Sequence, residues 1–180
     1  MASLLSTATQ VAHSAAVSLM SAAEVKPGAT IPTKVPVKEE EAAKTFTFES
    51  IKGRNVFVRY TAPRVYADIV EIPGYIKAYD QFKQKGIENI YVVAVNDVFT
   101  LKAWKEQLAP GGTPIHFIAD DKGAFVGALG MLFDASELLG APRSKRFVLV
   151  TEDDTVTHVA VEPVTSQLTI CAADKILPLL

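Results

Sequence analysis

Cys171 is the only cysteine in this 180-residue chain, so any thiol chemistry has a single candidate. A cysteine reacts as its thiolate, and a nearby cation lowers its pKa enough to form one. Cys171 is flanked by Ile170 and Ala172, and no cation lies closer in sequence than Lys175. These neighbours favour a small hydrophobic core side chain. The alternative is a low-pKa thiol at a helix start that forms mixed or intermolecular disulfides, because a single cysteine forms no internal one.

Asp68 and Arg146 are the second set of residues with the right chemistry for a site. Asp68 is followed three residues later by Glu71, a capping-box variant that predicts an N-cap and a helix from about Ile69 toward Lys85. Arg146 directly precedes the apolar run FVLV, and a buried arginine without an anion is costly. A sharper hypothesis pairs Asp68 with Arg146 in a fixed ion pair. The two interpretations of Asp68 are compatible.

Other kinds of site find little support in the residues. His13, His116 and His158 are scattered, and none has a ligand-like neighbour four residues on or a CxxC nearby, so we expect no metal ion. No P-loop and no GxGxxG after a strand is present, so we expect no nucleotide and no cofactor. Ser136 and Ser144 have no His–Asp set that the sequence places beside them.

Strand and helix patterns alternate along the chain and then give way to a hairpin. The run YVVAV is continuously apolar, which is typical of a strand covered on both faces. Glu152 to Thr155 indicates the hairpin turn. The order predicts an α/β fold with a mixed central β-sheet flanked by helices. The expected strands are 55–60, 91–95, 115–119, 146–150 and 156–161, and the expected helices are 69–85, 98–108, 124–129 and 172–180.

Several longer motifs occur in one order along the chain. They are KPGATIP, Pro73-Gly74-Tyr75, GIENIYVVAVNDVFTLKAWKEQL, DDKGAFVGALG and LLGAPRSKRFVLV. Together they resemble the peroxiredoxin family, specifically its peroxiredoxin-5-like branch with the fungal alkyl-hydroperoxide-reductase and peroxisomal-membrane-protein types. The resemblance runs from about Val25 to Leu180 and implies a thioredoxin-like fold. It also implies core positions, or a dimer contact, for Trp104 and Phe125.

The same resemblance implies a reactive cysteine just before Pro73-Gly74-Tyr75. Counting back from Pro73 places Ala67 or Asp68 at that position, and neither side chain forms a thiolate. Peroxide reduction begins with thiolate attack on the O–O bond and yields a sulfenic acid. Arg146 matches the family's site arginine, with Arg143 as the nearby alternative. The resemblance therefore implies a site that keeps its arginine and has lost its nucleophile.

Composition and charge narrow the class of protein. The hydrophobic content of 49% supports a full core, and the net charge of -2 argues against a nucleic-acid-binding surface. No apolar run is long enough for a transmembrane helix. One cysteine is consistent with a reducing compartment, so we expect an intracellular protein. The cytoplasm is the first choice, and mitochondria or peroxisomes are the alternatives, without a clear signal for either. The chain ends Leu-Pro-Leu-Leu rather than Ser-Lys-Leu.

Residues 1–23 form an N-terminal extension to a redoxin-like domain at 24–180. The extension is rich in Ser and Ala and carries no Lys or Arg, unlike a signal peptide or a mitochondrial presequence. Leu4, Val11, Ala15 and Leu19 recur at roughly helical spacing. Two interpretations stay open: a disordered or weakly helical tail, and an apolar stripe that docks on a partner or another subunit. We expect a homodimer or a subunit of a larger assembly.

Three functional hypotheses follow. The first is a peroxiredoxin-like protein without peroxidase activity that serves as a binding, structural or chaperone-like subunit. The second is a thiol-dependent peroxidase or redox sensor that uses Cys171 with an external reductant. The third is a pocket for a small anionic ligand held by Arg146 at a helix start. Asp68 argues against the third, because its carboxylate would repel an anion or occupy the arginine.

Overall fold

A computed structural model describes residues 20–59, 66–164 and 167–180 of the chain, and side chains at 66–70 and 138 are not described. The strands are β1 (Arg54–Arg59), β2 (Ile87–Ala94), β3 (His116–Ala119), β4 (Leu132–Phe133), β5 (Arg143–Ser144), β6 (Phe147–Glu152) and β7 (Thr155–Val161). The helices are α2 (Tyr66–Lys77), α3 (Tyr79–Gln84), α4 (Val98–Leu108), α5 (Ala124–Ala128), α6 (Ser136–Leu139), α7 (Ala173–Ile176) and the 3-10 helix η1 (Leu177–Leu179).

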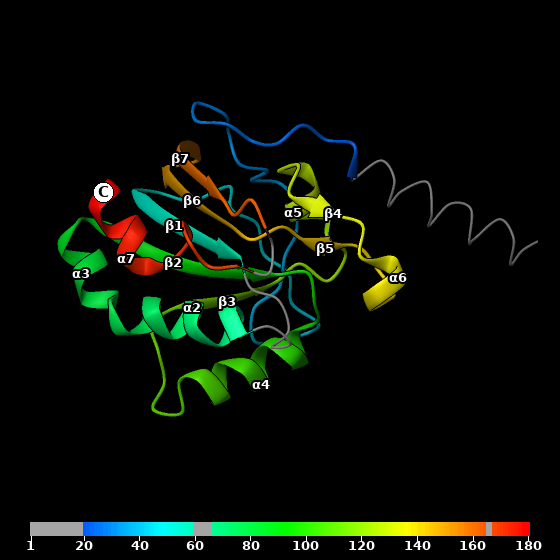
Figure 1. The fold of residues 1–180 in the computed structure, drawn as a ribbon, viewed down its shortest axis with the longest axis horizontal. Helices are drawn as coiled ribbons and strands as arrows, with labels where there is room; N and C mark the ends of the chain where they lie inside the picture. Colours follow the sequence, from blue (N-terminus) through cyan, green and yellow to red (C-terminus); the bar gives the residue numbers. More distant parts are fainter. Residues whose placement is uncertain (1–19, 60–65, 165–166) are drawn as a thin grey trace, which may run out of the picture.

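Five strands form a mixed sheet in the order β3-β2-β1-β6-β7 (Figure 1). The central strand β1 runs parallel to β2 and antiparallel to β6, and the β6–β7 hairpin closes one edge. The hairpin turns at Asp153, whose φ is 50°, a conformation that Asp tolerates better than most residues. This architecture confirms the predicted thioredoxin-like fold with a mixed sheet flanked by helices.

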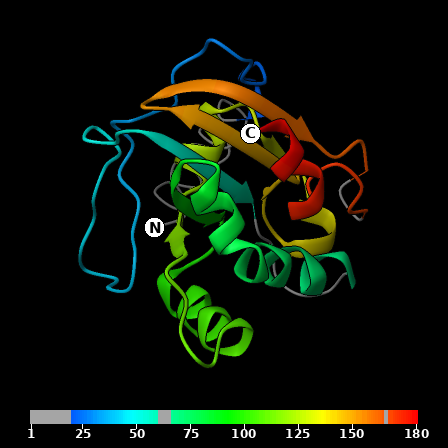
Figure 2. The same cartoon turned by 90° about the vertical axis from the view of Figure 1, so that its left-hand side faces the viewer.

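The two faces of the sheet are buried by different elements. Side chains alternate along β1, so Val56 and Val58 join one core cluster and Phe57 joins the other. The first cluster is covered by α2, α3, α4 and α7, which lie together in Figures 1 and 2. The second is covered by α5 and by the chain before β1. Phe125 packs in that second cluster and Trp104 in the first, as expected for core residues.

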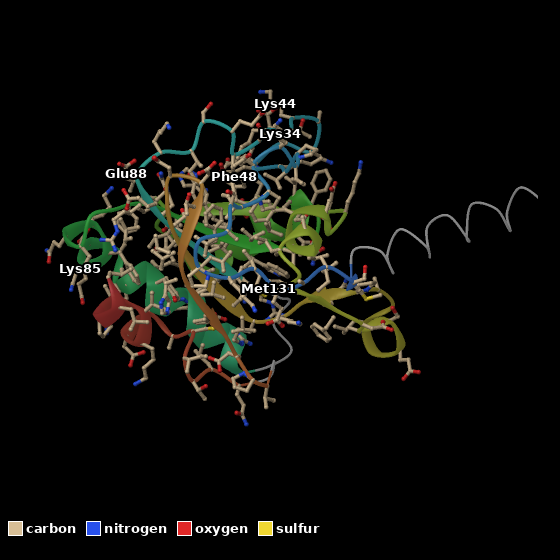
Figure 3. All side chains as sticks on the ribbon, turned by 90° about the horizontal axis from the view of Figure 1, so that it is seen from above. Lys34, Lys44, Phe48, Lys85, Glu88 and Met131 are labelled. Carbon is tan, nitrogen blue, oxygen red and sulfur yellow. The ribbon has the colours of Figure 1, made fainter. Side chains whose placement is uncertain are left out.

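Aromatic rings fill much of the second cluster. Phe48 lies 5.2 Å from both Phe57 and Tyr91 and 5.3 Å from Phe125, measured between ring centroids. Edge-on and tilted rings at such distances attract each other beyond the area that they bury. Figure 3 shows Phe48 inside this part of the molecule and Lys44 at its outer edge. The segment before β1 is thereby held against the sheet.

The helix α4 matches the predicted range of 98–108. Asp97 caps it by accepting a hydrogen bond from the Thr100 amide at 2.8 Å, and Val98, Leu101 and Trp104 are buried at helical spacing. Two other helices differ from expectation. The helix expected at 69–85 starts earlier, at Tyr66, and is interrupted at Ala78, where ψ is 4°.

The C-terminal helix is also shorter than predicted. The α-helical part covers Ala173–Ile176, and the chain continues as the 3-10 helix Leu177–Leu179. Pro178 explains the change, because proline has no N–H for an i−4 hydrogen bond. Within the described part of the chain, no helix is long and apolar enough to cross a membrane.

Candidate functional site

Arg146 lies between β5 and β6 and is completely buried. Its Nη1 donates to a carboxylate oxygen of Glu71 on α2, and Glu71 is as deeply buried as the arginine. A buried arginine needs an anion within reach, because removing a lone charge from water is costly. The expectation that Arg146 has an anionic partner is therefore confirmed, and the partner is Glu71.

Asp68 does not have the capping role that the sequence predicted. The helix α2 already begins at Tyr66, so Asp68 is its third residue and the N-cap prediction is wrong. The side chains of Ala67 and Asp68 lie outside the described part of the structure, as do residues 60–65. A pairing of Asp68 with Arg146 therefore stays a prediction.

Sequence reasoning missed Glu71 because it assigned this residue to the cap of a helix beginning later. Once α2 starts at Tyr66, Glu71 falls in its second turn, on the same helix face as position 68. One signal could have found it: Glu71 is followed by Ile72 and Pro73, and both Ile72 and Tyr75 belong to the core. A carboxylate among such neighbours faces inward and needs a cation.

Cys171 is buried next to the backbone of Arg146. Its side chain is 0% exposed, and its Sγ is 3.9 Å from the Arg146 carbonyl oxygen and 3.6 Å from that of Ala160. Burial raises the pKa of the Cys171 thiol far above its ordinary value, and the negative charges of Glu71 and Glu162 raise it further. Arg146 acts in the opposite direction but does not overcome them. The geometry fits the predicted core residue.

Two side chains hold the turn that contains Cys171. The Tyr75 hydroxyl, fully buried, donates to the Cys171 carbonyl oxygen at 2.7 Å. The carboxylate of Glu162 accepts hydrogen bonds from the amides of Thr169, Ile170 and Cys171 at 2.6, 2.8 and 2.9 Å, and one from the Thr169 hydroxyl. Burial raises the pKa of Glu162, but these hydrogen bonds outweigh it and leave that pKa below 4.5.

A groove opens beside this turn, between the α2–α3 pair and the C-terminal segment. Its volume is about 260 Å³, and Glu71 is one of the residues that line it. The walls are apolar and built from small or aliphatic residues: Gly74, Ala78, Leu168, Ala172, Ala173 and Leu177. Lys77 and Asp174 contribute one charge of each sign. The ion pair, the cysteine turn and the groove thus adjoin one another.

The remaining predicted positions do not join this site. Arg143 donates to the backbone oxygens of Pro142 and Leu139, and the assignment of Arg146 as the site arginine stays a prediction. His116 Nδ1 lies 3.0 Å from a carboxylate oxygen of Glu39, and His158 sits in β7. Among the described residues, no group of three or more His, Cys, Asp or Glu is arranged to hold a metal ion. His13 lies outside them.

Known proteins with similar sequences indicate the family of this chain. A scan against protein families matches residues 26–177 to the family described as Redoxin. The peroxisomal membrane associated protein 20 of Schizosaccharomyces pombe is 41% identical over 151 residues, which cover 83% of this chain and 96% of the relative.

Solved structures of peroxiredoxins are also similar to this chain. Peroxiredoxin 5 from Alvinella pompejana superposes with a TM-score of 0.76 at 30% identity, covering 86% of this chain and 96% of the other. Reduced Prx3 from Vibrio vulnificus, solved in complex with H₂O₂, superposes with a TM-score of 0.77 at 29% identity, covering 87% and 99% of the two chains.

Proposed function

Because this chain belongs to the redoxin family and lacks the peroxidatic cysteine of its peroxiredoxin-5-like branch, we propose that it has lost thiol-peroxidase activity. It acts instead as a non-catalytic binding, structural or chaperone-like subunit. The observation that carries this proposal is the buried pair of Glu71 and Arg146.

The pair matters because of what the arginine would otherwise do. A guanidinium beside a thiol stabilises the thiolate and lowers the pKa of the cysteine. Here the carboxylate of Glu71 neutralises Arg146, and the same negative charge raises the pKa of Cys171. A buried carboxylate that pairs with Arg146 supports a role for this pair in stability rather than in peroxide chemistry.

The anion-binding hypothesis gains no support from this arrangement. Arg146 is fully buried and already contacts Glu71, so an incoming anion would have to displace a carboxylate from inside the protein.

A peroxide-consumption assay tests the loss of activity. The full chain is incubated with H₂O₂ and thioredoxin or glutathione, beside Cys171→Ser and beside an active peroxiredoxin as a positive control. We expect no turnover above the reductant blank in either protein. Turnover at the level of the positive control would overturn the proposal.

The second candidate function is a redox enzyme or sensor that uses Cys171. Its support is the closeness of Sγ to the backbone of Arg146, and its difficulty is complete burial of the thiol. Intact mass after H₂O₂ treatment separates the two functions. A gain of one or more oxygen atoms in the wild type, absent in Cys171→Ser, would favour the sensor.

The chaperone-like form of the proposal needs its own measurement. Light scattering of a heat-denatured client enzyme should fall when the chain is added, relative to an equal mass of serum albumin. Unchanged scattering would contradict the chaperone-like role and leave the structural and binding roles as the proposal.

Location and assembly remain part of this proposal. We propose an intracellular location, with the cytoplasm first; the name of the S. pombe relative makes peroxisomes the alternative to examine. A fluorescent fusion imaged beside a peroxisomal marker distinguishes them. We also propose that the chain is a homodimer or part of a larger assembly, and that residues 1–23 are an extension of the 24–180 domain that takes part in it.

A further inference from the structure

We propose that the groove between α2, α3 and α7 binds the segment 1–19 of a second copy of this chain. The proposal rests on the non-catalytic role proposed above and names the two surfaces that would join subunits: the groove and the segment that binds in it. It rests on the shape, polarity and position of the groove.

Small residues create the groove. A Cβ built on Gly74 of α2 would lie 3.7 Å from the Cβ of Ala173 on α7, which is an ordinary van der Waals distance. Ala78 and Ala172 extend the small-residue lining on the two sides, and Leu168 and Leu177 supply its larger apolar walls. A cavity of about 260 Å³ with such walls favours aliphatic side chains.

The C-terminal segment also exposes apolar surface next to the residues that line the groove. Ile170 is 42% exposed and Leu179 is 54% exposed, and each lies within two residues of a lining residue in the sequence. Burying this apolar surface against a partner would be favourable, because it removes apolar area from water. The surface therefore continues beyond the cavity itself.

The charges at the groove fit an uncharged occupant. Lys77 and Asp174 line it with opposite signs, so neither a strongly basic nor a strongly acidic peptide is favoured. The segment 1–19 contains no Lys, Arg, Asp or Glu, and Leu4, Val11 and Leu19 give it an apolar stripe at roughly helical spacing. Its chemistry complements that of the groove.

The position of Met20 favours a second copy over the same molecule. The described chain starts on the side of α5 and β4, where the Val25 amide donates to the Leu129 carbonyl oxygen and Glu24 pairs with Lys145. Figure 1 shows this start and α7 at opposite ends of the molecule. Two copies that exchange their segments form a closed dimer, whereas copies that pass the segment from one to the next form a ring or an open chain of subunits.

The length of the segment allows this contact. At about 3.3–3.6 Å per extended residue, the 19 residues before Met20 span up to roughly 65 Å, enough to reach a neighbouring subunit.

Disulfide trapping between differently sized copies tests the contact in the full-length chain. Cys171→Ala removes the native thiol, so each copy carries one engineered cysteine. A copy with Leu4→Cys, Val11→Cys or Leu19→Cys is tagged and mixed with an untagged copy carrying Gln81→Cys, whose exposed side chain borders the groove. Diamide then oxidises two neighbouring thiols to a disulfide and is itself reduced to the hydrazine.

The matched control places the second thiol elsewhere. Lys44→Cys is exposed; Figure 3 labels Lys44 away from α7, and Figure 2 shows the segment that carries it on another side of the molecule. We expect a mixed-size dimer on a non-reducing gel with Gln81→Cys, at several-fold higher yield than with Lys44→Cys. Equal yields, or no mixed dimer from any of the three segment positions, would overturn the proposal.

A second measurement leaves the folded domain untouched. Val11→Asp with Leu19→Asp adds charge to the stripe, whereas Ser6→Asp with Ser14→Asp adds the same charge off it. The mass measured by sedimentation velocity should fall for the stripe variant and stay at the wild-type value for its control. Equal masses for all three chains would contradict the contact. Neither measurement depends on peroxide consumption, so failure here is distinguishable from failure of the proposed loss of activity.

Discussion

The helices α4 and α2 begin near the same edge of the sheet but satisfy their polar groups in opposite ways. At α4, Asp97 is exposed and bonds to Thr100, three residues away. At α2, Glu71 is buried and pairs with Arg146, which comes from a strand region far along the chain. Local capping can be recognised in a short stretch of sequence, whereas a buried pair depends on how distant elements pack.

The charged groups at the two helices also differ in their surroundings. The backbone hydrogen bond from Thr100 is the main cause that lowers the pKa of Asp97, and the Thr100 hydroxyl donates a second hydrogen bond to this exposed carboxylate. Glu71 and Arg146 depend mainly on protein groups, because both are excluded from solvent. Removing Asp97 from α4 should therefore lower the free energy of unfolding only slightly. Removing Glu71 from α2 should lower it much more.

The largest expected effect is that of Glu71→Ala. It leaves the positive charge of Arg146 buried without its carboxylate, so we expect the free energy of unfolding to fall by about 3–5 kcal/mol. Urea unfolding measures it, with Glu106→Ala on the exposed face of α4 as the control, expected within about 0.5 kcal/mol of wild type. The double variant Glu71→Met with Arg146→Met should recover much of the lost free energy of unfolding. A double variant less stable than Glu71→Ala would show that the unpaired charge of Arg146 does not cause the loss.

Glu162→Ala should have the next largest effect. It removes the acceptor for three amides and one hydroxyl in the turn 169–171, at a cost of about 2 kcal/mol. The released turn should also expose Cys171, so a thiol reagent should react with the native variant faster than with wild type. Glu152→Ala, exposed at the end of β6, is the control. Unchanged thiol reactivity would show that Glu162 does not hold the turn.

Asp97→Ala tests the local side of the comparison. Loss of an N-cap acceptor costs about 1 kcal/mol, because water replaces part of the interaction. Thermal unfolding should show this modest loss, and Lys102→Ala on the same helix should show less. A loss as large as that of Glu71→Ala would remove the contrast between the two helices.

The smallest expected effect is a change with pH. The folded-state pKa of Glu162 lies below 4.5, so its stabilisation is complete above the unfolded pKa and is lost as pH falls through the folded value. The pKa of Asp97 is also lowered, from its ordinary value of 3.8, so the stabilisation by Asp97 is likewise lost as the pH falls through the folded-state pKa. Burial raises the pKa of Asp120, which opposes this trend.

The difference between wild type and Glu162→Gln isolates one carboxylate from the others. Unfolding free energies measured from pH 7 to pH 3 should converge as the pH falls below about 4.5. Parallel curves would mean that Glu162 does not titrate with a lowered pKa.

The same contrast explains what the sequence could predict. The range of α4, the β6–β7 hairpin and the core role of Cys171 depend on neighbours in sequence or on composition, and those predictions hold. The predicted start of α2 was wrong because Asp68 with Glu71 imitates a capping box, whereas the helix begins at Tyr66. The partner of Arg146 was missed because no local pattern links it to a residue on α2.

The central position of β1 has a consequence for how this chain folds. Its residue Arg54 pairs with Ile87 on one side and with Glu152 on the other, so the middle of the sheet is completed only by residues near the C-terminus. Closing so long a loop before any contact forms slows folding. During synthesis the apolar edge of β1 would wait until β6 leaves the ribosome, and that interval is when the chain is most exposed to aggregation.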